Sequence, residues 1–257
     1  GVRLPKLGLV KATLYRTPPE HWILKSATVS QTKSGRYFCS LSYEFETPTP
    51  AEVLPTEDNT IGLDYSSPKF YVDDQGQSPD KMRWFRASEE KLAHEQRLLA
   101  NMKYGSKNYN RQLHKIQVLQ EYIANQRKDF IHKESRRIAN AYGAVCVEDL
   151  DLRGLSQALN FGKSTMDNGF GIFRTALRYK LAEQGKHLIF VDKWYPSSKT
   201  CSYCGGYFGE LKLGQEEWVC PHCGQVIPRD KNAGINIKRE GVRQFYTGLG
   251  GGMSTTA

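Results

Sequence analysis

Two Cys-x-x-Cys pairs constrain what this sequence can fold into more than any other feature. Cys201 and Cys204 form the first pair, Cys220 and Cys223 form the second, and fifteen residues separate the two pairs. This spacing is typical of a structural site in which four thiolates hold one Zn²⁺ ion, and the metal then replaces most of a hydrophobic core. Two disulfides are the alternative, but the paired spacing favours zinc, and we expect no secretory leader on this chain.

The other residues of this stretch have open roles. Because four thiolates complete a tetrahedral site, we expect His222 to be a surface residue that can contact a phosphate, not a fifth ligand. The aromatic side chains either stack on bases of single-stranded nucleic acid or cover a small zinc core. These aromatic residues are Tyr203, Tyr207, Phe208 and Trp218.

The charge of the chain predicts a polyanionic partner. The 257 residues include 36 lysines and arginines and 27 acids, which gives a formal net charge of +9. Nucleic acid is the usual partner of such a protein. Because the sequence has no run of eighteen apolar residues, we expect no membrane span and a cytoplasmic location, nucleoid-associated when the protein is bound to DNA. The chain opens on Gly1 without an initiator Met, so we also expect it to be a fragment of a longer protein.

The N-terminal segment is predicted to be a small β module followed by a linker, together covering residues 1–56. Apolar and polar residues alternate over residues 7–16, 22–32 and 36–46, which predicts antiparallel strands. The stretch 47–58 is rich in proline and acid and cannot continue a sheet. A second unit is expected to follow it.

Three acids lie at the ends of predicted elements. Asp64 ends an apolar strand over residues 60–64, and Glu148 lies at the end of another over 144–150. Asp230 opens the last predicted helix. Each acid has a structural alternative, which is a turn residue for Asp64, an exposed strand end for Glu148 and a helix N-cap for Asp230.

Residues 88–142 are predicted to form an antiparallel helical hairpin with a break at 104–106. Between Arg97 and Arg137 the sequence carries ten basic and three acidic residues. This pattern indicates either a solvated basic face or a surface for a phosphate backbone. The candidate nucleic-acid contacts are Lys103, Lys107, Arg111, Lys115, Arg127, Lys128, Lys133, Arg136 and Arg137.

The C-terminal part is predicted to contain another amphipathic helix that stops at Gly185. Its inward residues are Phe170, Phe173, Leu177 and Leu181, and the cations expected on its other faces are Arg174, Arg178 and Lys180. A strand over 187–195 follows it, and residues 248–257 are expected to form a disordered tail.

The order of these elements is that of an RNase H-like α/β fold. In such a fold the ends of neighbouring strands meet, so Asp64, Glu148 and Asp230 would form one carboxylate cluster. Carboxylate oxygens bind Mg²⁺ or Mn²⁺, and a pair of such ions serves the attacking and the leaving oxygen of phosphodiester cleavage.

Three tracts of the sequence carry a resemblance to a known family. They are IGLDYSSPKFYVDDQG from residue 61, VEDLDLRGL from residue 147, and the stretch from SSKTCSYCG through VCPHCG to RDKNAGINI. The chain resembles the TnpB-type (OrfB-like) transposon-encoded proteins, whose RuvC-like nuclease domain is interrupted by a zinc ribbon. It is also similar to compact type V CRISPR effectors. In that family the tracts carry the nuclease acids that match Asp64, Glu148 and Asp230.

The resemblance implies an RNA-guided, Mg²⁺- or Mn²⁺-dependent DNA endonuclease of a transposable element, with single-stranded or unwound DNA and a guide RNA as partners. It implies a RuvC-like core over 57–200 with the helical hairpin inside it, a zinc ribbon over 201–227, a last core segment over 228–247, and part of a wedge module at the N-terminus. The other functions considered are a non-cleaving, guide-dependent DNA-binding protein or repressor, and a transposase that transfers strands with the same acids.

Two positions depart from the family pattern. Ser66 stands where glycine is common, two residues after Asp64. Pro228 stands where the family often has aspartate, two residues before Asp230. Asp230 nevertheless keeps the family's spacing to the Asn-Ala pair that follows it.

Overall fold

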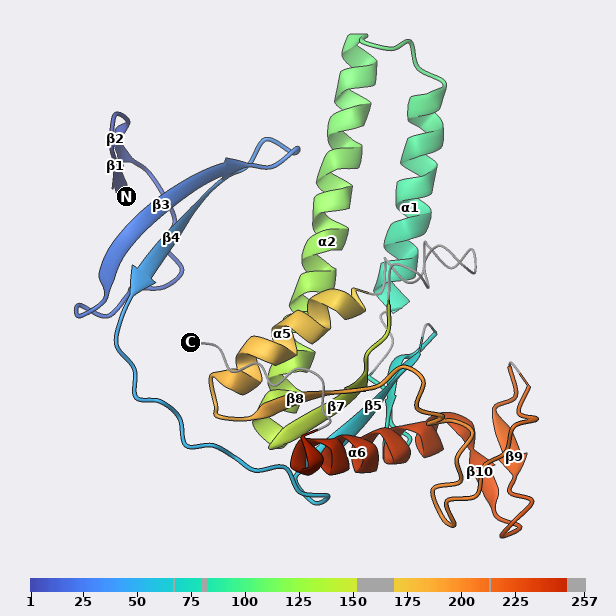
Figure 1. The fold of residues 1–257 in the computed structure, drawn as a ribbon. Coiled ribbons are helices and arrows are strands. Elements are labelled where there is room, and N and C mark those ends of the chain that lie inside the picture. The colour runs from blue at the N-terminus through green and yellow to red at the C-terminus, as the bar shows by residue number, and fades with distance from the viewer. Residues whose placement is uncertain (67, 80–82, 152–168, 213, 249–257) are drawn as a thin grey trace. The chain divides into compact units, whose positions relative to one another are not determined.

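The computed structural model describes residues 1–66, 68–79, 83–151, 169–212 and 214–248 (Figure 1). The chain divides into two compact units. Unit 1 is Gly1–Thr49 with Ala87–Ile123, and unit 2 is Pro50–Arg86 with Ala124–Ala257. The predicted tail from residue 249 onward and most of the loop that follows the acid at 148 lie outside the described residues.

The described elements are short strands and longer helices. The strands are β1 Val2–Leu4, β2 Gly8–Val10, β3 Ile23–Gln31, β4 Tyr37–Glu44, β5 Thr60–Ser66, β6 Phe70–Asp73, β7 Ala144–Glu148, β8 His187–Val191, β9 Glu217–Val219 and β10 Val226–Pro228. The helices are α1 Arg83–Ala100, α2 Lys107–Ala141, α5 Phe170–Ala182 and α6 Arg229–Thr247. Within the described residues, no helix combines the length and the apolar composition that a membrane span needs.

Unit 1 contains two antiparallel hairpins, β1 with β2 and β3 with β4. The strand predicted over residues 7–16 is wrong beyond Val10, where β2 ends. The reason is the pairing register. A tight turn, in which Lys6 and Gly8 have φ angles of 65° and 69°, sets Leu4 opposite Gly8, so Val10 pairs with Val2, the first residue of β1, and β1 offers no partner beyond it. β3 and β4 lie within the predicted strands.

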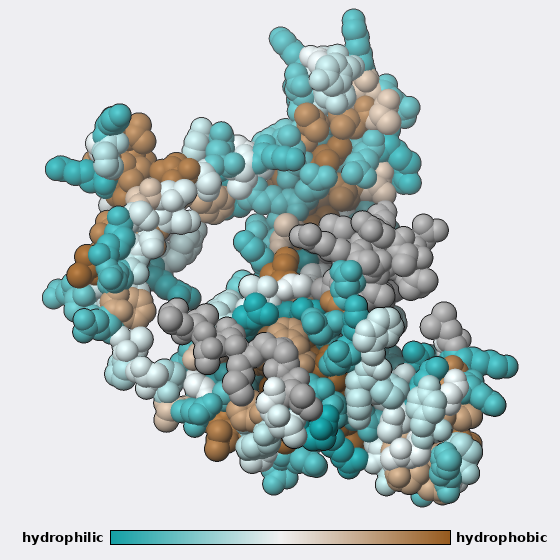
Figure 2. Space-filling model, viewed as in Figure 1, coloured by the Kyte–Doolittle hydropathy of each residue, from teal (hydrophilic) through white to brown (hydrophobic). Residues whose placement is uncertain are grey.

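The hairpin predicted over residues 88–142 is present as α1 and α2. α1 begins at Arg83, five residues earlier than predicted, and α2 follows the predicted break. The buried side-chain amide of Gln112 donates to the backbone oxygen of Glu95 at 3.0 Å and ties the two helices together. Apolar side chains lie between the helices in Figure 2. A groove of about 790 Å³ in this hairpin includes Val118, Leu119 and Tyr122 in its lining.

A four-stranded sheet in the order β6-β5-β7-β8 forms the centre of unit 2. β5, β7 and β8 are parallel, and β6 runs antiparallel to β5. With its helices the sheet makes unit 2 a mixed α/β structure. The prediction that the first strand ends on Asp64 is wrong, because β5 continues to Ser66, which pairs with Phe70 of β6.

Helices cover both faces of this sheet (Figure 1). Leu63 and Val147 belong to the core formed with α5 and the second half of α2, where Phe173 is fully buried. Cys146 belongs to the core formed with α6, where it lies near Ile237. Because successive side chains of a strand point to opposite faces, odd-numbered residues of β5 and β7 face α5 and even-numbered residues face α6.

The predicted linker, residues 47–58, contains no helix or strand, but its second half is held against unit 2. The Val53 amide donates to the Gly185 oxygen at 2.8 Å. The Tyr246 hydroxyl donates to the Pro55 oxygen at 2.8 Å. Unit 2 begins within this stretch, at Pro50.

α5 buries its predicted apolar face, and it also buries a lysine. Lys180, expected outside the core, is only 3% exposed. Its Nζ donates to the His132 oxygen at 2.7 Å and to the Ser135 Oγ at 2.8 Å, so the ammonium keeps hydrogen-bond partners. Burial lowers the pKa of Lys180. The prediction was wrong because both acceptors lie on α2, far away in sequence.

α6 packs closely against the sheet at Gly62. A Cβ at Gly62 would lie 2.0 Å from the Gly234 backbone oxygen and 2.8 Å from the Lys238 amide nitrogen. Because both are backbone atoms of α6, we expect Gly62→Ala to lower the free energy of unfolding by about 3 kcal/mol. Urea unfolding measures this effect. Gly209→Ala, at an exposed loop position, is the control and should change stability by less than about 0.5 kcal/mol. Equal midpoints for the two variants would contradict the close approach.

Candidate functional site

Asp64 and Glu148 lie side by side on neighbouring parallel strands. The register pairs Leu63 of β5 with Val147 of β7, so the next residues along the two strands are Asp64 and Glu148. Neighbouring strands are about 4.8 Å apart, and laterally adjacent positions of a parallel pair point to the same face. Both acids are therefore on the face of the sheet that packs against α6.

Asp230 reaches the same region from α6. The helix begins at Arg229 with Pro228 as its N-cap, so Asp230 lies in the first turn and is not the N-cap that the sequence allowed as an alternative. An acid in the first turn is favoured by the helix dipole. The Lys69 ammonium, between β5 and β6, lies 3.3 Å from the Asp230 Oδ2. The three predicted acids thus come from three different elements.

Electrostatics show that these acids interact. The pKa of the Asp64 carboxyl is raised well above its ordinary value, first by burial and then by the negative charges of Glu148 and Asp230. The pKa of Glu148 is also raised, first by burial, although a hydrogen bond from Ser197 and the charge of Arg229 oppose the shift. Neighbouring carboxylates raise each other's pKa because their negative charges repel. A divalent cation bound between them stabilises their ionised forms, so such carboxylates are suitable metal ligands.

Two cations flank the acids, and no sequence motif marks either of them. The charge of Arg229 lowers the pKa of both Asp64 and Glu148, against the larger effect of burial. Lys69 acts on Asp64 in the same direction and is ion-paired with Asp230. The available signal was closeness in sequence, since Arg229 precedes Asp230 directly and Lys69 follows Asp64 by five residues.

A loop between β8 and the first cysteine pair contacts both Glu148 and α6. Ser197 is buried, and its Oγ donates to the Glu148 Oε1 at 2.6 Å. Asn232 and Asn236, one turn apart on α6, donate to the backbone oxygens of Ser197 and Thr200 at distances from 2.6 to 3.3 Å. Thr200 directly precedes the first cysteine, so these bonds attach the cysteine loops to the helix that carries the third acid.

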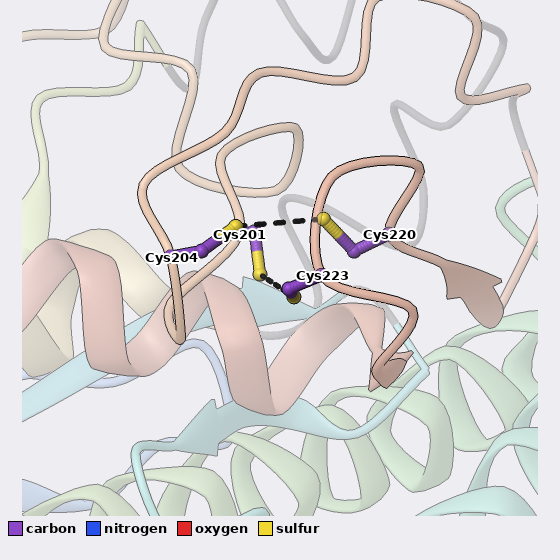
Figure 3. A group of neighbouring side chains, drawn as sticks. All are labelled: Cys201, Cys204, Cys220 and Cys223. Carbon is purple, nitrogen blue, oxygen red and sulfur yellow. Dashed lines mark hydrogen bonds between the residues drawn. The ribbon is translucent and has the colours of Figure 1, made fainter.

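The four cysteines converge on one point (Figure 3). Their sulfurs lie within 4.8 Å of one another, with 3.7 Å between Cys201 and Cys223 and 3.6 Å between Cys204 and Cys220. Zn²⁺ holds thiolate sulfurs at about 2.3 Å, which places the sulfurs of a tetrahedral site about 3.8 Å apart. The donors therefore fit one tetrahedral ion. Across the part of the chain that the structure describes, no other group of three or more His, Cys, Asp or Glu gathers its ligand atoms this closely.

The cysteine loops, residues 201–228, have a very small core of their own. Trp218 is buried beside the cysteines, and Phe208 stacks on it with ring centroids 5.2 Å apart. Base stacking is therefore wrong for Trp218, and both rings cover the cysteine site. Tyr203 and Tyr207 are exposed, and so is His222, as predicted.

The predicted nucleic-acid contacts fall into two groups. Four of the predicted contacts lie in unit 1, are exposed and have no ion pair to any described residue: Lys103, Lys107, Arg111 and Lys115. The remaining predicted contacts lie in unit 2, where three of them form ion pairs with acids. The ion pairs are Lys133 with Asp129 at 2.7 Å, Arg136 with Glu183 at 3.2 Å, and Arg137 with Glu134 at 2.7 Å. Of the others in unit 2, Arg127 is partly buried and Lys128 is exposed. The second group is less basic than its sequence suggests.

Comparison with known sequences identifies relatives for both halves of the chain. Residues 40–159 match the family OrfB_IS605, described as "Probable transposase", and residues 170–237 match the family described as "Cas12f1-like, TNB domain". A Streptomyces pristinaespiralis protein named "Putative RNA-guided DNA endonuclease" is 33% identical over 235 residues, which is 91% of this chain and 57% of that protein. The Escherichia coli (strain K12) protein "Putative RNA-guided DNA endonuclease InsQ" is 30% identical over 254 residues, which is 93% of this chain and 61% of that protein.

Comparison with solved structures shows a shared fold. A cryo-EM structure of a Cas12f1-sgRNA-target DNA complex matches with a TM-score of 0.54 and 20% identity, over 79% of this chain and 42% of the Cas12f1 chain. A second Cas12f ternary complex matches with a TM-score of 0.52 and 18% identity. The chain spans 57% and 61% of the length of the two sequence relatives described above.

Proposed function

Because the chain belongs to the TnpB-type (OrfB-like) family, we propose that it acts as a divalent-metal-dependent, RNA-guided DNA endonuclease of a transposable element. The sheet of unit 2 is then a RuvC-like nuclease core, and the cysteine loops are a zinc ribbon inserted into it. Single-stranded or unwound DNA is the substrate, and a guide RNA is the partner that selects it.

The interaction among Asp64, Glu148 and Asp230 carries this proposal. The strand register places the first two side by side, and the charges of Glu148 and Asp230 both raise the pKa of Asp64. A protein without a ligand for these groups would gain stability by replacing them, because buried like charges repel. A divalent cation bound among them would relieve this repulsion, which supports a cation-binding role.

Oxygen donors of this kind fit Mg²⁺ or Mn²⁺. Asp64, Glu148 and Asp230 would hold the metal, which supplies activation of the attacking water and stabilisation of the leaving oxygen. Lys69 and Arg229 lie beside the acids and offer positive charge to the phosphodiester. Ser197 fixes one oxygen of Glu148.

Zn²⁺ in the cysteine loops has a structural role in this proposal. Four thiolates leave no open position for water, which is typical of structural sites. Four of the exposed cations of unit 1 that have no ion pair to a described residue are the candidate contacts for the phosphate backbone, and contacts of this kind weaken as salt rises. They are Lys103, Lys107, Arg111 and Lys115.

Cleavage of labelled single-stranded and bubble-containing DNA by the purified chain tests the proposal. The reactions contain Mg²⁺, Mn²⁺ or EDTA, with and without RNA transcribed from the adjoining locus. We expect cleavage only with metal, and its rate should fall about 10³-fold in Glu148→Gln, because a lost metal ligand removes several kcal/mol of transition-state stabilisation. Glu210→Gln, an exposed glutamate of the cysteine loops, is the matched control and should cleave normally.

The products separate the competing functions. DNA products with free ends that form only when RNA is present would support guided hydrolysis. DNA products with newly joined ends would support strand transfer. RNA-dependent DNA binding without cleavage in any metal would support a non-cleaving binder. Cleavage that persists in Glu148→Gln would contradict the proposed site.

A further inference from the structure

Ser197 contacts the proposed metal ligand Glu148 at one end and α6 at the other. It is 5% exposed, and its Oγ donates to the Glu148 Oε1 at 2.6 Å. The two residues are 49 positions apart in sequence, so this bond joins the loop after β8 to the end of β7. Ser197 is neither an acid nor a cysteine, so its residue type does not mark it as part of a metal site.

The bond to Glu148 restricts how its carboxylate can turn. A glutamate at a strand end can rotate about its last bonds, and a partner on one oxygen selects one rotation. The Oε2 atom accepts no hydrogen bond from any described residue, so it is available to a ligand. Partners of this kind, which bind a metal ligand and not the metal, commonly set the geometry of metal sites.

The position of Ser197 is itself fixed by α6. Asn236 Nδ2 donates to the Ser197 oxygen at 2.7 Å and to the Thr200 oxygen at 2.6 Å. Asn232 Nδ2 donates to the same two oxygens at 3.3 and 2.8 Å. Both asparagines are buried, and Asn232 Oδ1 also accepts from the Ser202 amide at 2.8 Å, inside the first cysteine pair.

We propose that Ser197 is the positioning residue for Glu148, and that through it α6 and the cysteine loops together hold this carboxylate in place for the metal. The proposal rests on the proposed function, because it assumes that Glu148 binds a divalent cation. Replacing the hydroxyl leaves the backbone oxygen of residue 197 and its bonds from α6 unchanged, so the loop itself should stay in place.

Binding of Mn²⁺ to the 257-residue chain, followed by electron paramagnetic resonance of the free ion, tests this role. Zn²⁺ is kept saturating at the cysteines in a prior step, and excess is removed. Ser197→Ala should weaken Mn²⁺ binding about 10- to 100-fold, which is the usual effect of removing a partner of a metal ligand. Affinity of the zinc-loaded chain for DNA without added Mg²⁺ or Mn²⁺ should be unchanged, because Ser197 is buried.

Two variants serve as controls. Ser198→Ala removes the neighbouring hydroxyl, which has no hydrogen bond to a described residue, and should bind Mn²⁺ as the unmodified chain does. Ser197→Thr keeps a donor oxygen and should restore binding to within about threefold. Asn236→Ala combined with Ser197→Ala should weaken binding by less than the product of the separate effects, because both changes act on one connection.

The results distinguish this inference from the proposed function. If Ser197→Ala binds Mn²⁺ like the unmodified chain while Asp64→Asn does not bind it, the role of Ser197 is overturned and the metal site stands. If Ser197→Thr is as weak as Ser197→Ala, a positioning hydroxyl is overturned. If the unmodified chain binds no Mn²⁺, both proposals fail together.

Discussion

Asp64→Asn is expected to abolish metal-dependent cleavage and, at the same time, to make the metal-free chain more stable. The amide cannot supply the anionic oxygen that Mg²⁺ or Mn²⁺ requires, so cleavage should fall about 10³-fold or more. The same change removes a half-buried carboxyl whose ionised form is disfavoured by desolvation and by the negative charges of Glu148 and Asp230. Each kcal/mol gained raises the melting temperature by about 2–4 °C in a chain of this size.

The pH dependence of this gain has a definite sign. The folded-state pKa of Asp64 lies above the unfolded value, so below about pH 4 both states hold the proton and the variant gains nothing. As the pH rises, the unfolded chain ionises first and the unmodified protein loses stability. The advantage of Asp64→Asn should therefore grow from pH 4 upward and level off once the pH exceeds the folded-state pKa.

Thermal unfolding of the zinc-loaded chain, without added Mg²⁺ or Mn²⁺, at several pH values measures the effect, and the cleavage assay measures the loss of activity. Asp58→Asn is the matched control, since Asp58 is exposed in the same unit. Its melting temperature and cleavage rate should stay close to those of the unmodified chain. A metal-free Asp64→Asn protein that melts below the unmodified chain at pH 8 would contradict the electrostatic account of the site.

Removal of the metal from the cysteine loops should unfold them while leaving the sheet of unit 2 folded. The core of these loops is only a few side chains around Trp218, Cys201, Cys220 and Ile227. Metal binding at a structural thiolate site contributes about 10–16 kcal/mol to folding, far more than this core can supply. Cys220→Ser, or a chelator selective for zinc, should therefore abolish amide hydrogen-exchange protection over residues 201–228 and preserve it in β5 and β7.

The loss should extend to the carboxylate site. Asn232 and Asn236 bind the loop that carries Ser197 and enters the first cysteine pair, so unfolding of the cysteine loops frees the partner of Glu148. We expect cleavage to fall about 10- to 100-fold, less than for a lost metal ligand. Cys39→Ser in β4 of unit 1 is the control and should affect neither measurement. Full protection of residues 201–228 in metal-free protein would contradict this prediction.

Local patterns predicted the helices and the cysteine site. The apolar spacing over residues 88–142 was sufficient for α1 and α2, because helical contacts repeat every three to four residues. The cysteine spacing predicted the converging sulfurs, because two short turns bring each pair together without any distant contact. The same kind of reasoning failed for Lys180, whose partners lie on another helix.

The sequence by itself therefore determined which residues can bind metals, since the acids and the cysteine pairs are defined by residue type and short spacing. Only the tertiary structure decided that Asp64 and Glu148 are neighbours, that Asp230 approaches them, and that Ser197 holds Glu148. The register of β5 with β7 and the approach of α6 over Gly62 depend on contacts between residues far apart in the chain. Such contacts are set by packing and strand pairing, which leave no periodic signal in the sequence.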